Sequence, residues 1–204
     1  MAKPSFRLGP AASDCVAELA MEAEIPTLLA EAWAALGDAG VACAVIGGCA
    51  RNAYAEVRAT KDVDFVVEAS AENYPAVVEA LERRGFRRAT VVGAEAGGVP
   101  DLELFRDGEG RRVDILFAHT DFERSALSRR ELREPYAGVR VSVVSPEDLI
   151  VYKLLAGRPQ DRLDVLAMLD SFAQGSRTID WAYVEHWCDV WEARDALVRL
   201  RAEI

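Results

Sequence analysis

The sequence is poor in metal-binding and membrane-spanning signals. It has four cysteines, two histidines and no CxxC spacing among 204 residues, which excludes a structural zinc site or a c-type haem. No apolar run approaches the ~20 residues of a membrane span, and the opening MAKPSFRLGP lacks the apolar core of a signal peptide. We therefore expect a cytoplasmic protein that does not enter a membrane.

The charge balance is acidic, with 24 basic and 34 acidic residues and a net charge of −10. That balance argues against bulk affinity for nucleic acid or an anionic membrane. Arginine clusters in the middle of the chain form either a modest anion-binding surface or solvated faces; they are Arg83, Arg84, Arg87, Arg88, Arg124, Arg129, Arg130 and Arg133.

The hydrophobic pattern predicts an α/β (α+β) fold, a mixed sheet flanked by helices and followed by a helical C-terminal part. Strands are expected over 41–46, 62–67, 87–92 and 139–144, with a hairpin formed by 101–106 and 111–117. Helices are expected over 13–23, from 26 to about 37, from 49 to 57 and over 71–84, 146–156, 161–174 and 180–203. The chain accordingly divides into a core, 1–144, and a helical subdomain, 145–204.

Three acidic residues carry the strongest chemical signal. Residues two apart in a strand point to the same face, so Asp62 and Asp64 present their carboxylates together. Asp114 interrupts the apolar strand VDILF, where a charge is costly unless something binds it. Carboxylates this close repel unless a cation lies between them, and oxygen-only ligands suit magnesium.

A glycine pair stands at the junction between the first strand and the helix that follows it. Gly47 and Gly48 allow backbone N–H groups to approach a phosphate, and the helix N-terminus adds a favourable dipole. Alone, each of these features is also typical of an ordinary turn or of solvated caps.

The order of these features resembles the nucleotidyltransferase fold of the DNA polymerase β superfamily. Ile46-Gly47-Gly48, a thirteen-residue spacer and Asp62-Val63-Asp64-Phe65 match its signature, and Asp114 matches the third carboxylate of its metal triad. The resemblance implies transfer of a nucleoside monophosphate from a nucleoside triphosphate to an acceptor hydroxyl, with two magnesium ions held by the three aspartates.

The same resemblance suggests further site residues. Lys153, one of only three lysines, is the candidate for neutralising the triphosphate. The alternative is that it is an exposed lysine on a helix surface. Arg51 and Arg58 either reach phosphate or pair with Glu56 at the surface. Asp161 and Asp164 share a helix face, where they either orient Lys153 or Arg158 or form ordinary helix pairs.

A narrower resemblance, to the AbiEii-type nucleotidyltransferases of toxin-antitoxin loci, follows from the flanks. The matching segments are Gly47-Gly48-Cys49-Ala50, Arg58 to Asp64, Lys153 to Arg158 and Asp161 to Asp164; Pro159-Gln160 departs from the pattern where a lysine is common. It implies a toxin-like enzyme of a type IV system, acting on RNA or protein, with a cognate antitoxin. The alternatives are a small-molecule (aminoglycoside-type) nucleotidyltransferase and a catalytically silent binding module.

Overall fold

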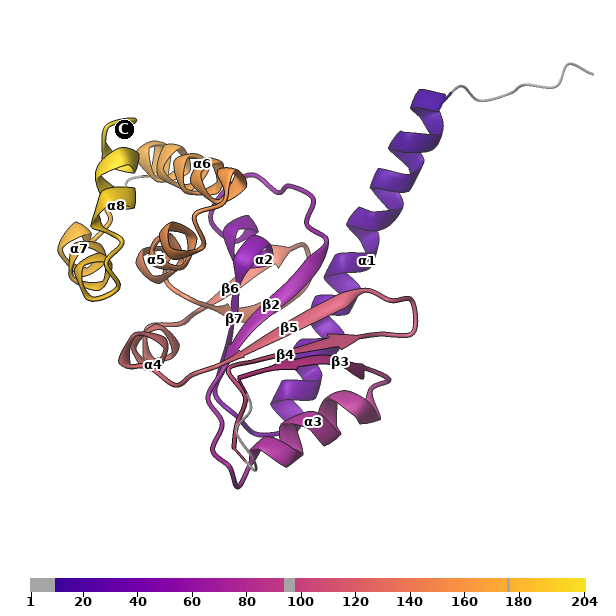
Figure 1. Ribbon diagram of the computed structural model, residues 1–204. Coiled ribbons are helices and arrows are strands. Elements are labelled where there is room, and N and C mark those ends of the chain that lie inside the picture. Colours follow the sequence, from indigo (N-terminus) through magenta and orange to yellow (C-terminus); the bar gives the residue numbers. More distant parts are fainter. Residues whose placement is uncertain (1–9, 94–97, 176) are drawn as a thin grey trace, which may run out of the picture.

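The computed structural model of the protein describes residues 10–93, 98–175 and 177–204. Within these residues the chain forms a seven-stranded mixed sheet with helices on its faces and a helical C-terminal part, which confirms the predicted fold class (Figure 1). The strands are β1 (Cys43–Ile46), β2 (Asp62–Val67), β3 (Arg87–Val92), β4 (Leu102–Arg106), β5 (Arg112–Phe117), β6 (Glu131–Tyr136) and β7 (Val139–Val143). The helices are α1 (Pro10–Asp38), α2 (Gly47–Asn52), α3 (Tyr74–Arg83), α4 (Asp121–Ser128), α5 (Pro146–Ala156), α6 (Pro159–Gly175), α7 (Trp181–Val190) and α8 (Arg194–Arg201).

Strand β2 lies at the centre of the sheet, whose order is β3-β4-β5-β2-β1-β7-β6. It pairs in parallel with β5 and antiparallel with β1, whereas β4 and β5 form the predicted antiparallel hairpin. Val63, Phe65, Val113 and Ile115 are fully buried on one face of this centre. Side chains alternate along a strand, so the intervening aspartates lie on the opposite face.

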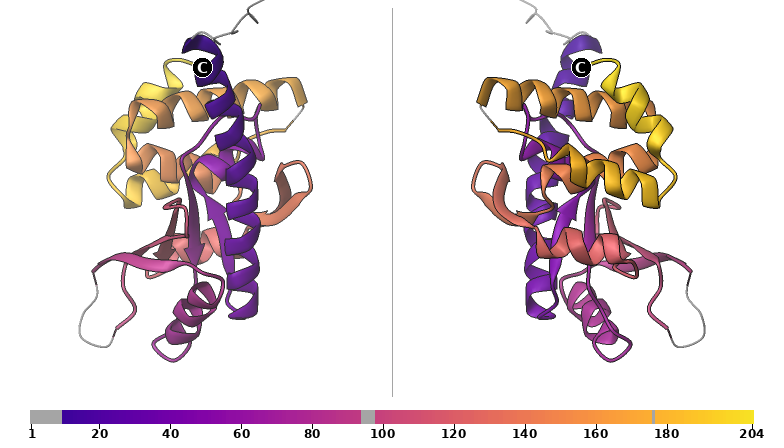
Figure 2. Two further views of the ribbon diagram at one scale, coloured as in Figure 1. Left: turned by 90° about the vertical axis from the view of Figure 1, so that its right-hand side faces the viewer. Right: turned by 90° about the vertical axis from the view of Figure 1, so that its left-hand side faces the viewer.

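Helix α1 packs against the buried face of the sheet and against α3, and α4 and the C-terminal helices lie on the other side (Figure 2). The sequence predicts two helices separated before Pro26, but the structure has one continuous helix through it. Proline removes a single backbone donor, while α1 buries Ile25 directly before Pro26 and an apolar face after it. The residues of that face are Leu28, Leu29, Ala32, Ala35 and Leu36.

The sequence pattern does not predict two of the elements, helix α4 and strand β6. Helix α4 is only eight residues long, and its N-terminal signal is a capping box between Thr120 and Glu123. Strand β6 is an edge strand whose alternating charges and Pro135 hide the strand pattern, and its register shifts between Arg133 and Tyr136. Proline is tolerated at such edges and bulges.

The C-terminal part begins as predicted, with Ser145 accepting a hydrogen bond from the backbone N–H of Asp148 at the start of α5. The predicted boundary after residue 144 falls between β7 and α5. The single helix predicted over 180–203 is instead α7 and α8, because Glu192 adopts a left-handed φ of 55° between them. No helix among the described residues is long and apolar enough to cross a bilayer.

Candidate active site

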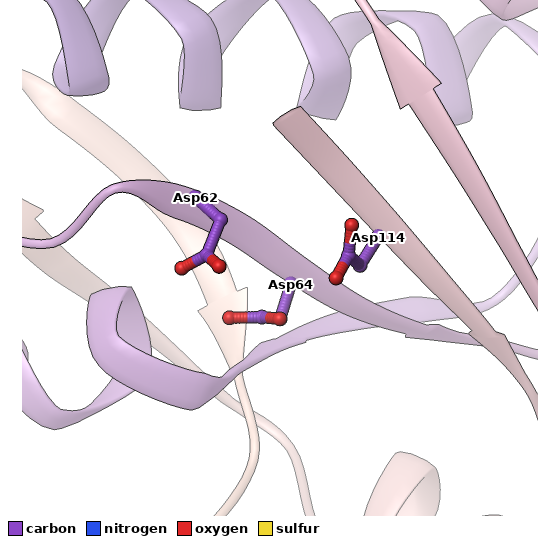
Figure 3. A group of neighbouring side chains, drawn as sticks. All are labelled: Asp62, Asp64 and Asp114. Carbon is purple, nitrogen blue, oxygen red and sulfur yellow. The ribbon is translucent and has the colours of Figure 1, made fainter. Parts of the chain in front are cut away.

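Strands β2 and β5 bring the three predicted metal ligands together. Their parallel register places Asp64 beside Asp114, and Asp62 beside Arg112. One carboxylate oxygen from each of Asp62, Asp64 and Asp114 lies within 4.8 Å of the other two (Figure 3). Because strand pairing fixes these positions, the backbone ladder sets the spacing of the carboxylates.

The electrostatics of this group favour a bound cation. Burial, reinforced by the charges of Asp62 and Asp114, raises the pKa of Asp64 to about 7. Burial also raises the pKa of Asp114, and the nearby Arg112 opposes that shift. Oxygen-only ligands with converging negative charge are the donor set that Mg²⁺ prefers, so the residues present fit a divalent ion.

The glycine pair makes room for this site. A Cβ atom at Gly47 would overlap the carboxylate of Asp64, and the φ of +67° at Gly47 is one that other residues adopt only with strain. A Cβ at Gly48 would lie 2.6 Å from Oγ1 of Thr60. Thr60 in turn donates to Oδ1 of Asp62 over 3.3 Å. The glycines therefore make room for the carboxylate of Asp64 and for the hydroxyl of Thr60 that bonds to Asp62.

Lys153 lies in a buried ion-pair network rather than on a helix surface. Its side chain is 4% exposed, and Nζ donates to Asp161 over 2.9 Å and to Asp164 over 2.6 Å. Arg58 donates to both oxygens of Asp164 at 2.7 Å, and Arg158 donates to Asp161 over 2.6 Å. Both aspartates thus bond to Lys153, and Asp161 also forms the i,i+3 pair with Arg158, so both arrangements that the sequence left open are present.

These cations control the charge of the two carboxyls. Burial by itself raises the pKa of Asp164, but hydrogen bonds from Arg58 and Lys153 outweigh it and lower the pKa to about 2. Burial likewise opposes ionisation of Asp161, whose pKa is lowered by Arg158 and Lys153. Both carboxylates are therefore held ionised by positive partners.

Arg51 lies away from the carboxylate strands. It is buried, donates to the backbone carbonyl of Glu56 and to Asn52, and its Nε lies 3.8 Å from Asp164. These contacts engage its guanidinium within the protein. They do not test the predicted nucleotide-binding role of Arg51, which stays a prediction.

A pocket of about 300 Å³ joins the carboxylate strand to the helical part. Two cations that the sequence prediction did not single out line it, Lys61 and Arg158. Lys61 is exposed and, in the part of the chain that the structure describes, forms no ion pair. The remaining lining residues are Gly48, Arg58, Ala59, Thr60, Asp62, Asp64, Lys153, Gln160 and Asp161.

A third overlooked residue, Arg112, contacts the carboxylates themselves. It pairs with Asp62 through Nη2, and its Nε lies 3.0 Å from Oδ1 of Asp114. Its signal in the sequence is its position two residues before Asp114, which puts both side chains on one face of β5.

The sheet, the glycine pair and the converging carboxylates define the class as a nucleotidyltransferase. The chain belongs to the family described as "Nucleotidyl transferase of unknown function (DUF2204)", whose model matches residues 26–199. No curated protein sequence matches the chain.

Several solved structures share the fold. The solution structure of the antibiotic-resistance factor ANT(2'')-Ia is 18% identical with a TM-score of 0.59, and the match covers 90% of this chain and 99% of that one. A crystal structure of ANT(2'')-Ia in complex with adenylyl-2''-tobramycin is 17% identical with a TM-score of 0.56, covering 84% and 98%. An antigenic nucleotidyltransferase-like protein from Paracoccidioides brasiliensis is 19% identical with a TM-score of 0.51, covering 88% and 93%.

Proposed function

We propose that the protein is a magnesium-dependent enzyme that moves a nucleoside monophosphate from a nucleoside triphosphate to an acceptor hydroxyl. The observation that carries this proposal is the convergence of Asp62, Asp64 and Asp114 within 4.8 Å beside a pocket lined by cations. Family membership supports the same reaction class.

The reaction is an in-line substitution at the α-phosphorus. The acceptor oxygen forms a bond to that phosphorus, the bond to the bridging oxygen of the β-phosphate breaks, and pyrophosphate leaves with the electron pair. In this proposal Asp114 accepts the proton of the attacking hydroxyl. Mg²⁺ held by Asp62, Asp64 and Asp114 would neutralise charge on the phosphates and acidify the acceptor hydroxyl.

The cations of the pocket have separate roles in this proposal. Lys61 and Arg158 line the pocket, and Arg158 is 69% exposed, so both can reach a triphosphate. Lys153 and Arg58 are engaged by Asp164, and they contribute positive charge to the wall of the pocket while they fix its shape. Gly47 and Gly48 leave the strand-to-helix junction open to a phosphate.

The direct test is transfer of label from α-³²P nucleoside triphosphates in the presence of Mg²⁺. The double change Asp62→Asn and Asp64→Asn should lower transfer at least about 10³-fold, because it removes the charge that binds the metal. The matched control is Asp121→Asn, whose carboxylate is 89% exposed on α4. Transfer by the double variant at the wild-type rate would overturn the proposal, as would equal transfer from γ-labelled triphosphate.

A small cationic molecule is the acceptor that two observations favour. The net charge of −10 attracts polycations, and the fold match spans 99% of the antibiotic-resistance factor ANT(2'')-Ia, which a second structure shows in complex with adenylyl-2''-tobramycin. In the labelling assay, this acceptor class predicts label on an aminoglycoside set and none on RNA or protein.

A toxin-like role on RNA or protein, with a cognate antitoxin, is the second candidate. It is supported by the AbiEii-type spacing from Arg58 to Asp64 and from Lys153 to Asp164, and by the arginine clusters. It predicts label on a tRNA band or on protein from a lysate. A neighbouring gene for a small DNA-binding protein whose product abolishes transfer would identify the antitoxin.

A further inference from the structure

Arg112 lies among the proposed metal ligands although it is a cation. The β2·β5 register sets it directly beside Asp62, and it precedes Asp114 by two residues on the same strand face. Its guanidinium therefore bridges the outer two carboxylates, donating to Asp62 through Nη2 and approaching Oδ1 of Asp114 with Nε at 3.0 Å. A single positive group thus spans the space between the carboxylates of adjacent strands.

The hydrogen bonding of the Arg112 guanidinium is incomplete. Nε of Arg112 and Oδ1 of Asp114 are both shielded from solvent, yet neither has a hydrogen-bond partner, because their close approach lacks hydrogen-bond geometry. Within the described residues, the one hydrogen bond that the guanidinium donates is to Asp62. The side chain is also 38% exposed, so the guanidinium can move out into solvent.

The charges at this position favour exchange for a divalent ion. Arg112 supplies one positive charge to three carboxylates, and it satisfies one of them with a directed bond. A divalent cation supplies twice the charge and accepts oxygen ligands from all three at once. The guanidinium that is hydrogen-bonded to Asp62 and close to Asp114 competes with a metal ion for oxygens of these two carboxylates.

We propose that Arg112 is a built-in counter-ion, which occupies the metal position of the metal-free protein and swings out when the divalent ion enters. The inference rests on the proposed function, because it takes Asp62, Asp64 and Asp114 as the metal ligands. Arg112 is a positioning residue: it stabilises the three carboxylates without metal, and by competing for their oxygens it sets how tightly metal binds.

The test compares two arginines that face each other across neighbouring strands. Arg106 on β4 lies opposite Arg112 in the β4·β5 register, but donates to the carbonyl of Gly110 and contacts no carboxylate of the triad. Arg106→Gln and Arg112→Gln therefore remove the same charge from the same part of the sheet. Binding of Mn²⁺ is measured by the loss of its free-ion EPR signal, and thermal unfolding is followed with Mn²⁺ and with chelator.

Arg112→Gln should bind Mn²⁺ about tenfold more tightly than wild type, the effect of one charge-assisted hydrogen bond lost from the metal-free state. In chelator its midpoint of unfolding should fall, and Mn²⁺ should restore it. Arg106→Gln should bind Mn²⁺ within about twofold of wild type, and Arg112→Lys, which keeps the charge, should lie near wild type.

Other outcomes overturn the inference in distinguishable ways. Equal or weaker Mn²⁺ binding by Arg112→Gln would remove the counter-ion role and leave the metal site standing. If Arg106→Gln gained as much Mn²⁺ affinity as Arg112→Gln, general charge repulsion would explain the effect, and the proposed exchange of the guanidinium for the metal ion would be wrong. Absence of Mn²⁺ binding by both wild type and Arg112→Gln would overturn the inference together with the metal-dependent proposal.

Discussion

Two groups of aspartates, one on the sheet and one on α6, each contribute to the lining of one pocket and have opposite electrostatic states. On the sheet, burial and the neighbouring carboxylates raise the pKa of Asp64 to about 7. On α6, hydrogen bonds from Arg58 and Lys153 outweigh burial and hold the pKa of Asp164 at about 2. The residue type and the crowding of charge are the same in both groups, and the α6 pair is the more deeply buried of the two.

The difference is the supply of positive partners. Asp161 and Asp164 receive charged hydrogen bonds from Lys153, Arg58 and Arg158, so their charge is neutralised within the chain. Among the described residues, the cation that pairs with the sheet group is Arg112, hydrogen-bonded to one of its three carboxylates. We infer that the aspartates on α6 serve the structure, whereas the aspartates on the sheet bind a cation. The following changes test that division.

The largest effect on stability is expected from Lys153→Met. Removing the ammonium leaves Asp161 and Asp164 buried beside each other with fewer positive partners, and breaking a buried pair in this way costs roughly 3–5 kcal/mol. Urea unfolding monitored by circular dichroism measures the loss.

The control for that change is Lys61→Met, which removes an exposed lysine that forms no ion pair in the described part of the chain. Its free energy of unfolding should stay within about 0.5 kcal/mol of wild type, while label transfer falls if Lys61 contacts triphosphate. Equal losses of stability in the two lysine variants would contradict a structural role for Lys153.

The next effect is a pH dependence carried by Asp164. Its pKa is about 2 in the folded protein and about 3.9 in an unfolded chain, so the unfolded state takes up the proton first as pH falls. The stabilisation is therefore present above about pH 4 and is lost as pH falls from about 4 towards 2, amounting to roughly 2–3 kcal/mol.

Urea unfolding of wild type and Asp164→Asn at several pH values checks this dependence. The gap between the two proteins should shrink over that pH range. For the exposed Asp121→Asn the gap should be small at every pH. A gap for Asp164→Asn that is constant from pH 6 to pH 3 would show that its ion pairs contribute no pH-dependent stability.

A smaller effect separates two glycines with the same backbone conformation. Gly40 has a φ of +68° with nothing near its missing Cβ, whereas Gly47 has a φ of +67° and faces Asp64. Alanine at either position should cost about 1–2 kcal/mol of stability through backbone strain. Only Gly47→Ala displaces the Asp64 carboxylate, so only it should lose Mn²⁺ binding and label transfer; loss in both variants would count against the contact.

The smallest effect has the opposite sign. Asp64→Asn should raise the metal-free stability by about 1 kcal/mol, or about 3 °C in Tm, because it removes one of three closely spaced carboxylates that repel one another. Scanning calorimetry in chelator measures the shift. On α6, Asp164→Asn should lower Tm under the same conditions, and a fall in Tm for both variants would erase the distinction between the two groups.

The carboxylate strands were predictable because their signal is local. Asp62 and Asp64 share a face by strand alternation alone, and the apolar residues around Asp114 mark its strand. Helix α4 and strand β6 were not predicted, since a short capped helix and a charged edge strand with Pro135 lack a clear period. The continuity of α1 through Pro26 depends on packing against the sheet, which overrides a local breaker.

The partners of Lys153 could be predicted only in part. Asp161 and Asp164 lie near it in sequence, and their spacing is compatible with two interpretations. One of these is that they orient Lys153. The contact from Arg58, 106 residues away from Asp164, depends on the approach of α6 to the loop before β2. Arg112 shows the same limit, because its contact with Asp62 follows from the pairing of two distant strands.

The bond between Arg58 and Asp164 crosses the predicted boundary between the core and the helical part. Arg129 crosses it as well, its Nη2 donating to Oε2 of Glu147 over 3.2 Å. Arg58 stands on the segment that leads into β2, so the anchoring of that segment and the seating of α6 depend on one another. The cooperative unit is thus larger than either predicted part: heating should melt 1–144 and 145–204 in a single transition, and the core separated from its helices should lose the order of its own carboxylate strand.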